Sequence, residues 1–167
     1  ARIAHGPSGL EEGRRSPMFL RKELIKVGLD AADEEDALRQ MSAEFVALGV
    51  AKDSFPEALL ERERVYPTGL PAIAFDIAIP HCASENVNET SMGVAVLAHP
   101  VEFLQMGSPE ITLHPEILFM LAIKDPKKQI ETLQKIMGVI QNANLLNAIK
   151  KAQSADEVYE LLAPEVE

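Results

Sequence analysis

Apolar residues recur at helical spacing twice in the first half of the chain. Residues 33–48 show the three- and four-residue spacing of a buried helix face, acidic residues crowd their first turn, and Gly49 follows as a stop signal. A second helix is predicted from Ser54 to about Arg64, because Ser54 and Glu57 have the spacing of a capping box. We therefore expect two helices in this half of the chain.

Short apolar runs in the middle of the chain predict strands. One such run covers residues 72–79, and another covers residues 92–97. Residues 101–103 are predicted to form a short edge strand, with a loop around residues 107–109. Residues 116–123 are almost continuously apolar, which indicates a central strand buried on both faces.

The chain is predicted to end in three helices. Asp125 and Pro126 are a typical N-cap and first helical residue, and two shorter helices follow. The last helix has Ser154 and Glu157 as its capping box. The buried stripe of the first of these helices is predicted to contain Ile130, Leu133, Ile136, Met137 and Ile140.

This order of elements predicts an α/β fold, a single domain in which a mixed β-sheet is flanked by helices on both faces. The 167 residues, of which 47% are hydrophobic, suffice for one core of ordinary size. We assign residues 18–167 to this domain. Residues 1–17 contain three glycines and two prolines without a sustained period, and we interpret them as a flexible N-terminal arm or an expression remnant.

Net charge and cysteine content exclude several classes of function. The formal charge of −10 opposes binding to nucleic acid or to an anionic membrane. One cysteine forms no internal disulfide, and no apolar run approaches the roughly 20 residues of a membrane span, so a cytoplasmic location is predicted. The phosphate loop Gly-x-x-x-x-Gly-Lys is missing from the sequence, so a phosphoryl group would have to come from another protein.

Among the four histidines, His81 has the most suitable position for a nucleophile that works near neutral pH. Pro80 directly precedes His81 and ends the predicted strand, so the ring of His81 should lie at the end of a strand, at the border of the sheet. His5 lies in the N-terminal arm, whereas His99 and His114 each precede a proline in a loop, where surface histidines are common.

Two rival chemistries have less support. His81 and Cys82 are adjacent in an extended segment, so their side chains point to opposite faces and do not form a Cys–His dyad. Short spacings between metal-ligating His and Cys residues do not occur, and neither a metal nor a cofactor is predicted.

Several motifs follow one another in a recognisable order and distance. The motifs are Arg62-Glu63, Tyr66-Pro67-Thr68-Gly69-Leu70, Ile77-Ala78-Ile79-Pro80-His81-Cys82, and Leu121-Ala122-Ile123 leading into Gln129. With these motifs the chain resembles the IIA domain of the fructose–mannitol type of sugar phosphotransferase system (PTS), and within it the galactitol branch, in which Cys follows the His. The similarity covers residues 19–162.

The resemblance implies a phosphocarrier. In this interpretation His81 accepts a phosphoryl group from the phosphorylated carrier protein HPr and donates it to a cysteine of a IIB component, which serves the membrane IIC permease. The substrate implied is galactitol or a related polyol or sugar. The alternative is a regulatory IIA-like domain, whose phosphorylation controls binding to another protein rather than transport.

The resemblance also implies roles for three further side chains. Arg62 would neutralise the arriving phosphoryl dianion, and Thr68 would donate its hydroxyl. Gln129 stands where mannitol and fructose members have a second histidine, and its amide can donate a hydrogen bond but carries no charge. Each also has a structural interpretation: Arg62 on a solvated helix face, Thr68 as a turn residue and Gln129 as a first-turn polar residue. The second ring nitrogen of His81 should donate to a backbone carbonyl or a carboxylate, which the sequence does not identify.

Overall fold

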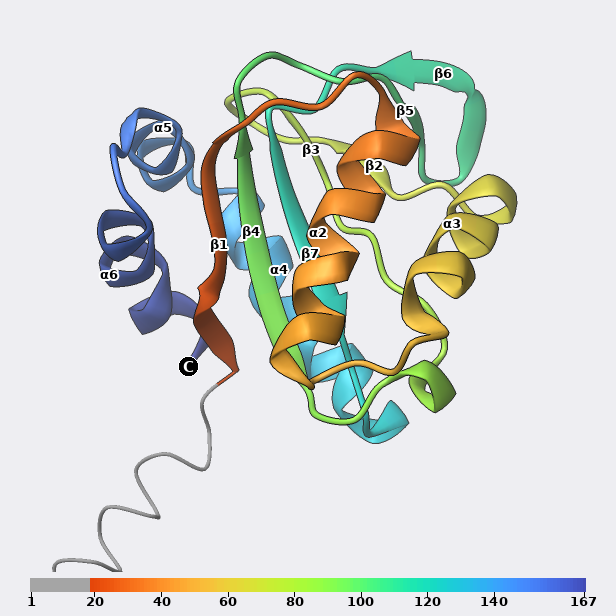
Figure 1. The fold of residues 1–167 in the computed structure, drawn as a ribbon. Coiled ribbons are helices and arrows are strands. Elements are labelled where there is room, and N and C mark those ends of the chain that lie inside the picture. Colours follow the sequence, from red (N-terminus) through yellow and green to blue (C-terminus); the bar gives the residue numbers. More distant parts are fainter. Residues whose placement is uncertain (1–18) are drawn as a thin grey trace, which may run out of the picture.

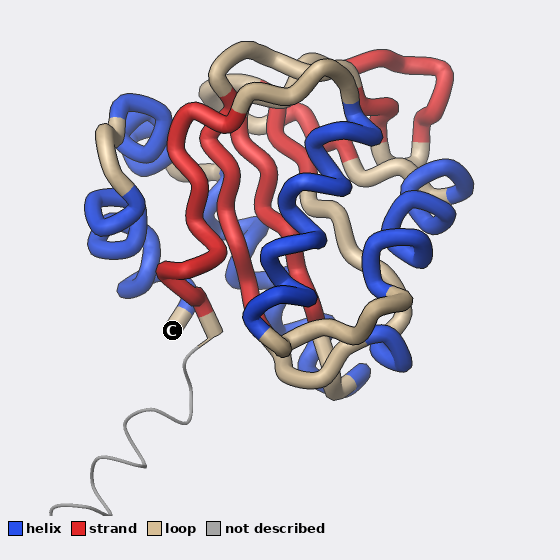
Figure 2. Tube along the Cα trace, in the orientation of Figure 1, coloured by secondary structure: helices blue, strands red, loops and turns tan. Residues whose placement is uncertain are grey.

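The computed structural model describes residues 19–167, so the predicted arm at residues 1–17 lies outside the described residues. The described chain forms one seven-stranded mixed sheet with helices on both faces, which confirms the predicted α/β fold (Figures 1 and 2). In chain order the elements are β1 (Leu20–Leu29), α2 (Glu34–Leu48), α3 (Phe55–Val65), β2 (Gly69–Pro71), β3 (Asp76–Ala78), β4 (Ser91–Leu97), β5 (Phe103–Gln105), β6 (Ser108–Leu113), β7 (Ile117–Ala122), α4 (Gln129–Ile140), α5 (Ala143–Lys151) and α6 (Ala155–Val166).

The strands lie in the order β1-β4-β7-β3-β2-β5-β6. Parallel and antiparallel pairings alternate across the sheet, beginning with the parallel pair β1–β4 and ending with the antiparallel pair β5–β6. All residues of β7 are buried, which confirms the prediction of an inner strand covered on both faces. Among helices of the described chain, none is long and apolar enough to cross a bilayer.

Successive residues of β7 contribute to two separate cores. Leu118 and Met120 pack in the core beneath α2 and α3, whereas Phe119 and Leu121 pack in the core beneath α4, α5 and α6. The two groups of helices lie on opposite faces of the sheet (Figure 1). This alternation follows from the two-residue period of side chains along a strand.

Two predicted helix starts have different outcomes. Ser154 caps α6 by accepting from the backbone N–H of Glu157, as the capping box predicts. The helix predicted from Ser54 to about Arg64 is confirmed as α3, but the predicted capping role of Ser54 is wrong, because its own backbone is already helical and its hydroxyl donates to Oδ1 of Asn86 at 2.8 Å. A hydroxyl held by the neighbouring loop is not available for the backbone of α3.

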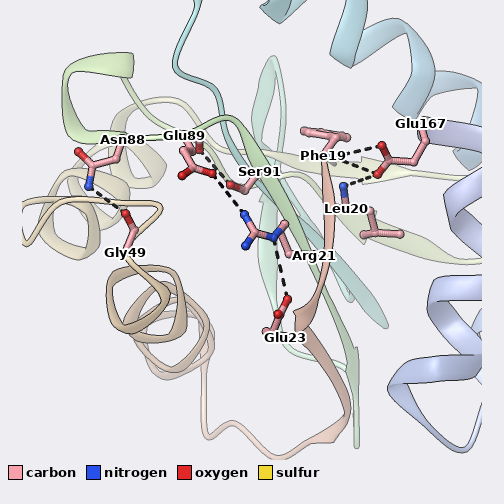
Figure 3. A network of polar contacts seen from close by, with 9 residues as sticks. All are labelled: Phe19, Leu20, Arg21, Glu23, Gly49, Asn88, Glu89, Ser91 and Glu167. Atoms are coloured by element: carbon pink, nitrogen blue, oxygen red, sulfur yellow. Dashed lines mark hydrogen bonds and ion pairs between the residues drawn. The ribbon is translucent and has the colours of Figure 1, made fainter. Parts of the chain in front are cut away.

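The sequence pattern missed β1, so the predicted order beginning with two helices is wrong. Charged residues interrupt this strand, and a register shift between Leu20 and Ile25 breaks its alternation. Such features are usual on edge strands, because charge there discourages pairing with another chain. Glu167 holds the start of the strand by accepting from the backbone N–H groups of Phe19 and Leu20, and Arg21 lies 3.4 Å from Glu89 (Figure 3).

Two further strand predictions need correction. Residues 72–79 do not form one strand, because β2 and β3 form an antiparallel hairpin that turns at residues 72–75. The apolar turn residues mimic a strand pattern, although Ile73 is 68% exposed. The predicted edge strand at residues 101–103 begins only at Phe103 and lies inside the sheet. The solvent-exposed β6 forms that edge, and its first two residues belong to the loop predicted around residues 107–109.

The predicted buried stripe of α4 is also partly wrong. Ile130 is 70% exposed and Met137 is 41% exposed, whereas Ile136 and Ile140 are buried as predicted. A short 3₁₀ helix, η2 (Pro126–Lys128), precedes α4 and is capped by Asp125. A 3₁₀ helix has fewer residues per turn than an α-helix, so η2 rotates the direction in which the following side chains of α4 point. The prediction assumed α-helical spacing from Asp125 onward and therefore misplaced the buried face.

Candidate functional site

The candidate nucleophile lies in the extended segment that leaves β3. Ile79 donates its backbone N–H to the carbonyl of Thr68 at 3.1 Å, and Leu121 of β7 donates to the carbonyl of Pro80 at 2.9 Å. Two neighbouring strands therefore hold the backbone immediately before His81. The ring of His81 is partly buried.

The ring nitrogens of His81 have different roles. Nδ1 lies 2.7 Å from the backbone carbonyl oxygen of Ile79. A carbonyl oxygen only accepts, so Nδ1 carries the hydrogen of the neutral ring and Nε2 keeps a free lone pair. The partner that the sequence left open is thus a backbone carbonyl rather than a carboxylate.

Burial and charge keep this imidazole neutral. The pKa of His81 is lowered below its ordinary value, first by burial, which disfavours the imidazolium, and also by the positive charge of Arg62; the bond to Ile79 acts in the opposite direction. A neutral ring with an unprotonated Nε2 is the nucleophilic form at neutral pH.

Arg62 lies in the last turn of α3, and its positive charge helps to lower the pKa of His81. It also opposes the larger effect of burial, which raises the pKa of Cys82. Its guanidinium stacks over the ring of Tyr66, 4.5 Å from the centroid. Within residues 19–167 Arg62 forms no ion pair with a carboxylate. A cation in this state can bind an arriving dianion.

Thr68 has a hydrogen-bond partner in the described chain, the side chain of Glu63. Its hydroxyl donates to the carboxylate of Glu63 at 2.8 Å, and its backbone N–H donates to the same carboxylate at 2.7 Å. Thr68 is only 2% exposed and Glu63 only 4%. The hydroxyl proton is therefore directed at Glu63, which sequence reasoning did not single out although it belongs to the Arg62-Glu63 motif.

Gln129 is the first residue of α4 and is partly buried. It follows β7, the strand that bonds to Pro80, by a short connection containing η2. No hydrogen bond within residues 19–167 joins Gln129 to His81. The start of α4 thus follows the strand next to the histidine segment, and no hydrogen bond in the described chain joins the two side chains.

Cys82 is a weak nucleophile in this environment. Burial raises the pKa of its thiol to about 11, so the thiol is protonated at neutral pH. Its sulfur lies 3.9 Å from the side-chain amide nitrogen of Asn86 rather than accepting from the imidazole of His81. A Cys–His dyad is absent from the described chain.

The other described histidines lie on the surface, as predicted. His99 contacts Asp30 at 3.0 Å and His114 contacts Glu102 at 3.6 Å, and both rings are more than half exposed. His5 lies outside the described residues. Within the described part of the chain, no three His, Cys, Asp or Glu residues are grouped so as to hold a metal ion.

A mixed sheet with helices on both faces and a histidine at a strand end agree with one class of protein, the IIA components of phosphotransferase systems. The chain belongs to the family described as "Phosphoenolpyruvate-dependent sugar phosphotransferase system, EIIA 2", whose family model matches residues 18–164. It is therefore a phosphoryl carrier of the PTS EIIA type.

Individual relatives agree with this assignment. The chain is 25% identical over 125 residues to the galactitol-specific EIIA component of the PTS from Escherichia coli strain K12, covering 75% of this chain and 83% of the relative. The crystal structure of IIA mannitol from Escherichia coli has the same fold, with a TM-score of 0.70 at 23% identity, covering 85% of this chain and 97% of that one. The complex of Escherichia coli IIA mannitol with phosphorylated IIB mannitol gives 0.72 at 23% identity, covering 87% and 99%.

Proposed function

We propose that this protein carries its phosphoryl group on Nε2 of His81, taking it from phospho-HPr and giving it to a cysteine of a IIB component. The observation that carries the proposal is the bond between Nδ1 and the Ile79 carbonyl, which leaves Nε2 as the free nucleophile. The proposed setting is the cytoplasm, where IIB serves the membrane IIC permease, and residues 18–167 would act as one domain.

The transfer balances without a cofactor. Nε2 attacks phosphorus, a bond from phosphorus to Nε2 forms, and the bond from phosphorus to the donor nitrogen breaks. The proton of His81 stays on Nδ1 and is held by Ile79, which stabilises the positive charge of the phosphorylated ring. In the second step a IIB thiolate attacks phosphorus and Nε2 leaves as a neutral imidazole nitrogen.

Two side chains are proposed to stabilise the transferring group. Arg62 lies close to His81 and forms no ion pair in the described chain, so its guanidinium can neutralise charge on the phosphoryl oxygens. Gln129 would contribute its neutral amide at the start of α4. Thr68 belongs to the proposed site through its carbonyl and its bonds to Glu63, rather than through contact with phosphate.

The substrate proposal is galactitol or a related polyol or sugar. It is supported by the galactitol-specific relative and by Cys82 following His81. The IIB partner is supported by the complex formed by the mannitol relative.

The proposed role is tested by intact-mass measurement after incubation with phosphoenolpyruvate, enzyme I and HPr. Wild type should gain one phosphoryl group and His81→Ala none, because His81 is the one histidine of residues 19–167 that is sheltered from solvent, and its Nδ1 is held by a backbone carbonyl. His99→Ala and His114→Ala are the matched controls and should behave as wild type. Equal labelling of His81→Ala would overturn the assignment. Discharge of the phosphoprotein by IIB would indicate transport, whereas its absence would favour the regulatory alternative.

A further inference from the structure

Glu63 is a buried carboxylate without a cationic partner among residues 19–167. Both of its oxygens face Thr68, at 2.7 Å from the backbone nitrogen and 2.8 Å from the hydroxyl oxygen. A buried carboxylate is normally paired with a cation, because removing its charge from water is costly. Burying Glu63 therefore costs free energy, and its two hydrogen bonds hold Thr68 in place.

The residue that it fixes is linked to the nucleophile. The carbonyl of Thr68 accepts from the backbone N–H of Ile79 at 3.1 Å, and the carbonyl of Ile79 accepts from Nδ1 of His81 at 2.7 Å. Thr68 directly precedes β2 and Ile79 directly follows β3, so this link closes the open end of their hairpin. Only two residues separate the carboxylate from the imidazole along this path.

We propose that Glu63 is a positioning residue for phosphoryl transfer, which acts through Thr68 and Ile79 to hold His81 in the tautomer that presents Nε2. The inference rests on the proposed function of His81. A neutral imidazole without such a partner exchanges between two tautomers, and only one of them has its lone pair on the outer nitrogen. If Thr68 is no longer held, the Ile79 carbonyl can move away from Nδ1. The neutral His81 ring then populates both tautomers.

The direct test removes the carboxylate and measures the ring. In Glu63→Ala, nitrogen NMR of the neutral His81 ring should show a mixture of tautomers instead of one form with hydrogen on Nδ1. The transfer rate from phospho-HPr should fall about 10- to 100-fold, the usual loss when a side chain that orients a reactive group is removed. Glu61→Ala is the matched control, because Glu61 lies in the same helix but is exposed, and among residues 19–167 its ion pair is with Arg64.

Milder variants keep the inference testable if Glu63→Ala does not fold. Glu63→Gln and Thr68→Val each remove part of the contact, and both should give a smaller change in tautomer and rate than Glu63→Ala. Thr68→Ser keeps the hydroxyl and should restore the tautomer with hydrogen on Nδ1 that Thr68→Val loses. Folded Glu63→Gln and Thr68→Val proteins with the wild-type tautomer and rate would overturn the inference.

The two proposals fail in different ways. A wild-type protein that accepts no phosphoryl group, while the Glu63 variants still change the tautomer, would refute the proposed function and leave the positioning role in place. A phosphorylated wild type with variants that change neither quantity would refute the positioning role alone.

Discussion

Arg62 and Gln129 differ in what they can offer to a phosphoryl group. A charge-assisted hydrogen bond is about twice as strong as a neutral one. We therefore predict that Arg62→Ala slows transfer by about 10²-fold, the scale of losing one electrostatic stabiliser in a sheltered site, and that Gln129→Ala costs less. The rates are measured by quenched-flow transfer from phospho-HPr.

Gln129→His is the sharper control for this comparison. It introduces a donor that carries charge below pH ~6.5, so transfer should remain active and acquire a new pH dependence near neutrality. A fully active Gln129→Ala together with an unchanged pH profile for Gln129→His would place Gln129 outside the site.

Glu63 should make the stability of the protein depend on pH. Burial raises its pKa from 4.5 to about 7, and the neighbouring charge of Glu34 adds to the shift; burial also raises the pKa of Glu34, to about 6. The folded state therefore holds protons that the unfolded state has released. This contribution to stability is fully present below about pH 4.5 and is lost as the pH rises through 7.

We predict that Glu63→Gln removes most of this dependence. Between about pH 5 and pH 8 the free energy of unfolding of wild type should fall relative to that of the variant, by up to about 3 kcal/mol for Glu63. Urea unfolding at the two pH values measures the difference, and Glu61→Gln is the exposed control. Parallel profiles for wild type and Glu63→Gln would contradict the raised pKa.

At the scale of elements, the close packing of β4 on its neighbours depends on Gly93. A Cβ at this position would lie 2.7 Å from the carbonyl oxygen of Leu24 in β1 and 3.0 Å from the ring of Phe45 in α2. We predict that Gly93→Ala destabilises the protein by about 1–3 kcal/mol, because strand and helix must both move apart.

Gly138 is the matched control within α4. A Cβ there meets no neighbouring atom within 4 Å, and the residue is exposed. Gly138→Ala should stabilise the protein by about 0.5–1 kcal/mol through helix propensity alone. Both values come from chemical denaturation, and a stable Gly93→Ala protein would show that β4 tolerates a wider separation from β1 and α2.

At the scale of the molecule, β7 couples the two cores. Phe119 is fully buried in one core, while its neighbours Leu118 and Met120 are fully buried in the other. We predict that Phe119→Ala lowers the free energy of unfolding by about 3–5 kcal/mol and that both cores still unfold together. Methyl NMR signals of Leu59 and Ile149, one in each core, should disappear at the same urea concentration, and separate midpoints would contradict this coupling.

Local interactions explain which features were predictable from the sequence. The helix α2 has its N-cap at Asp33, which accepts from the backbone of Asp36, and its C-cap at Gly49, whose φ of 87° favours glycine. The continuous apolar run of β7 indicates that the strand is buried, and Pro80 marks the strand end next to His81. Each of these signals involves residues that are close together in the sequence, so it can be recognised without knowing the tertiary structure.

Tertiary structure decided the features that need a distant partner. The charged edge strand β1 exists because β4 and two layers of helices support it, and no local pattern indicates this. The bond from the backbone N–H of Ile79 to the carbonyl of Thr68 forms only when β3 pairs with β2, and it fixes the Ile79 carbonyl that accepts from His81. The sequence thus determined which histidine is the candidate, whereas the fold decided its tautomer, because the acceptor for Nδ1 is a backbone carbonyl whose place depends on the packing around it.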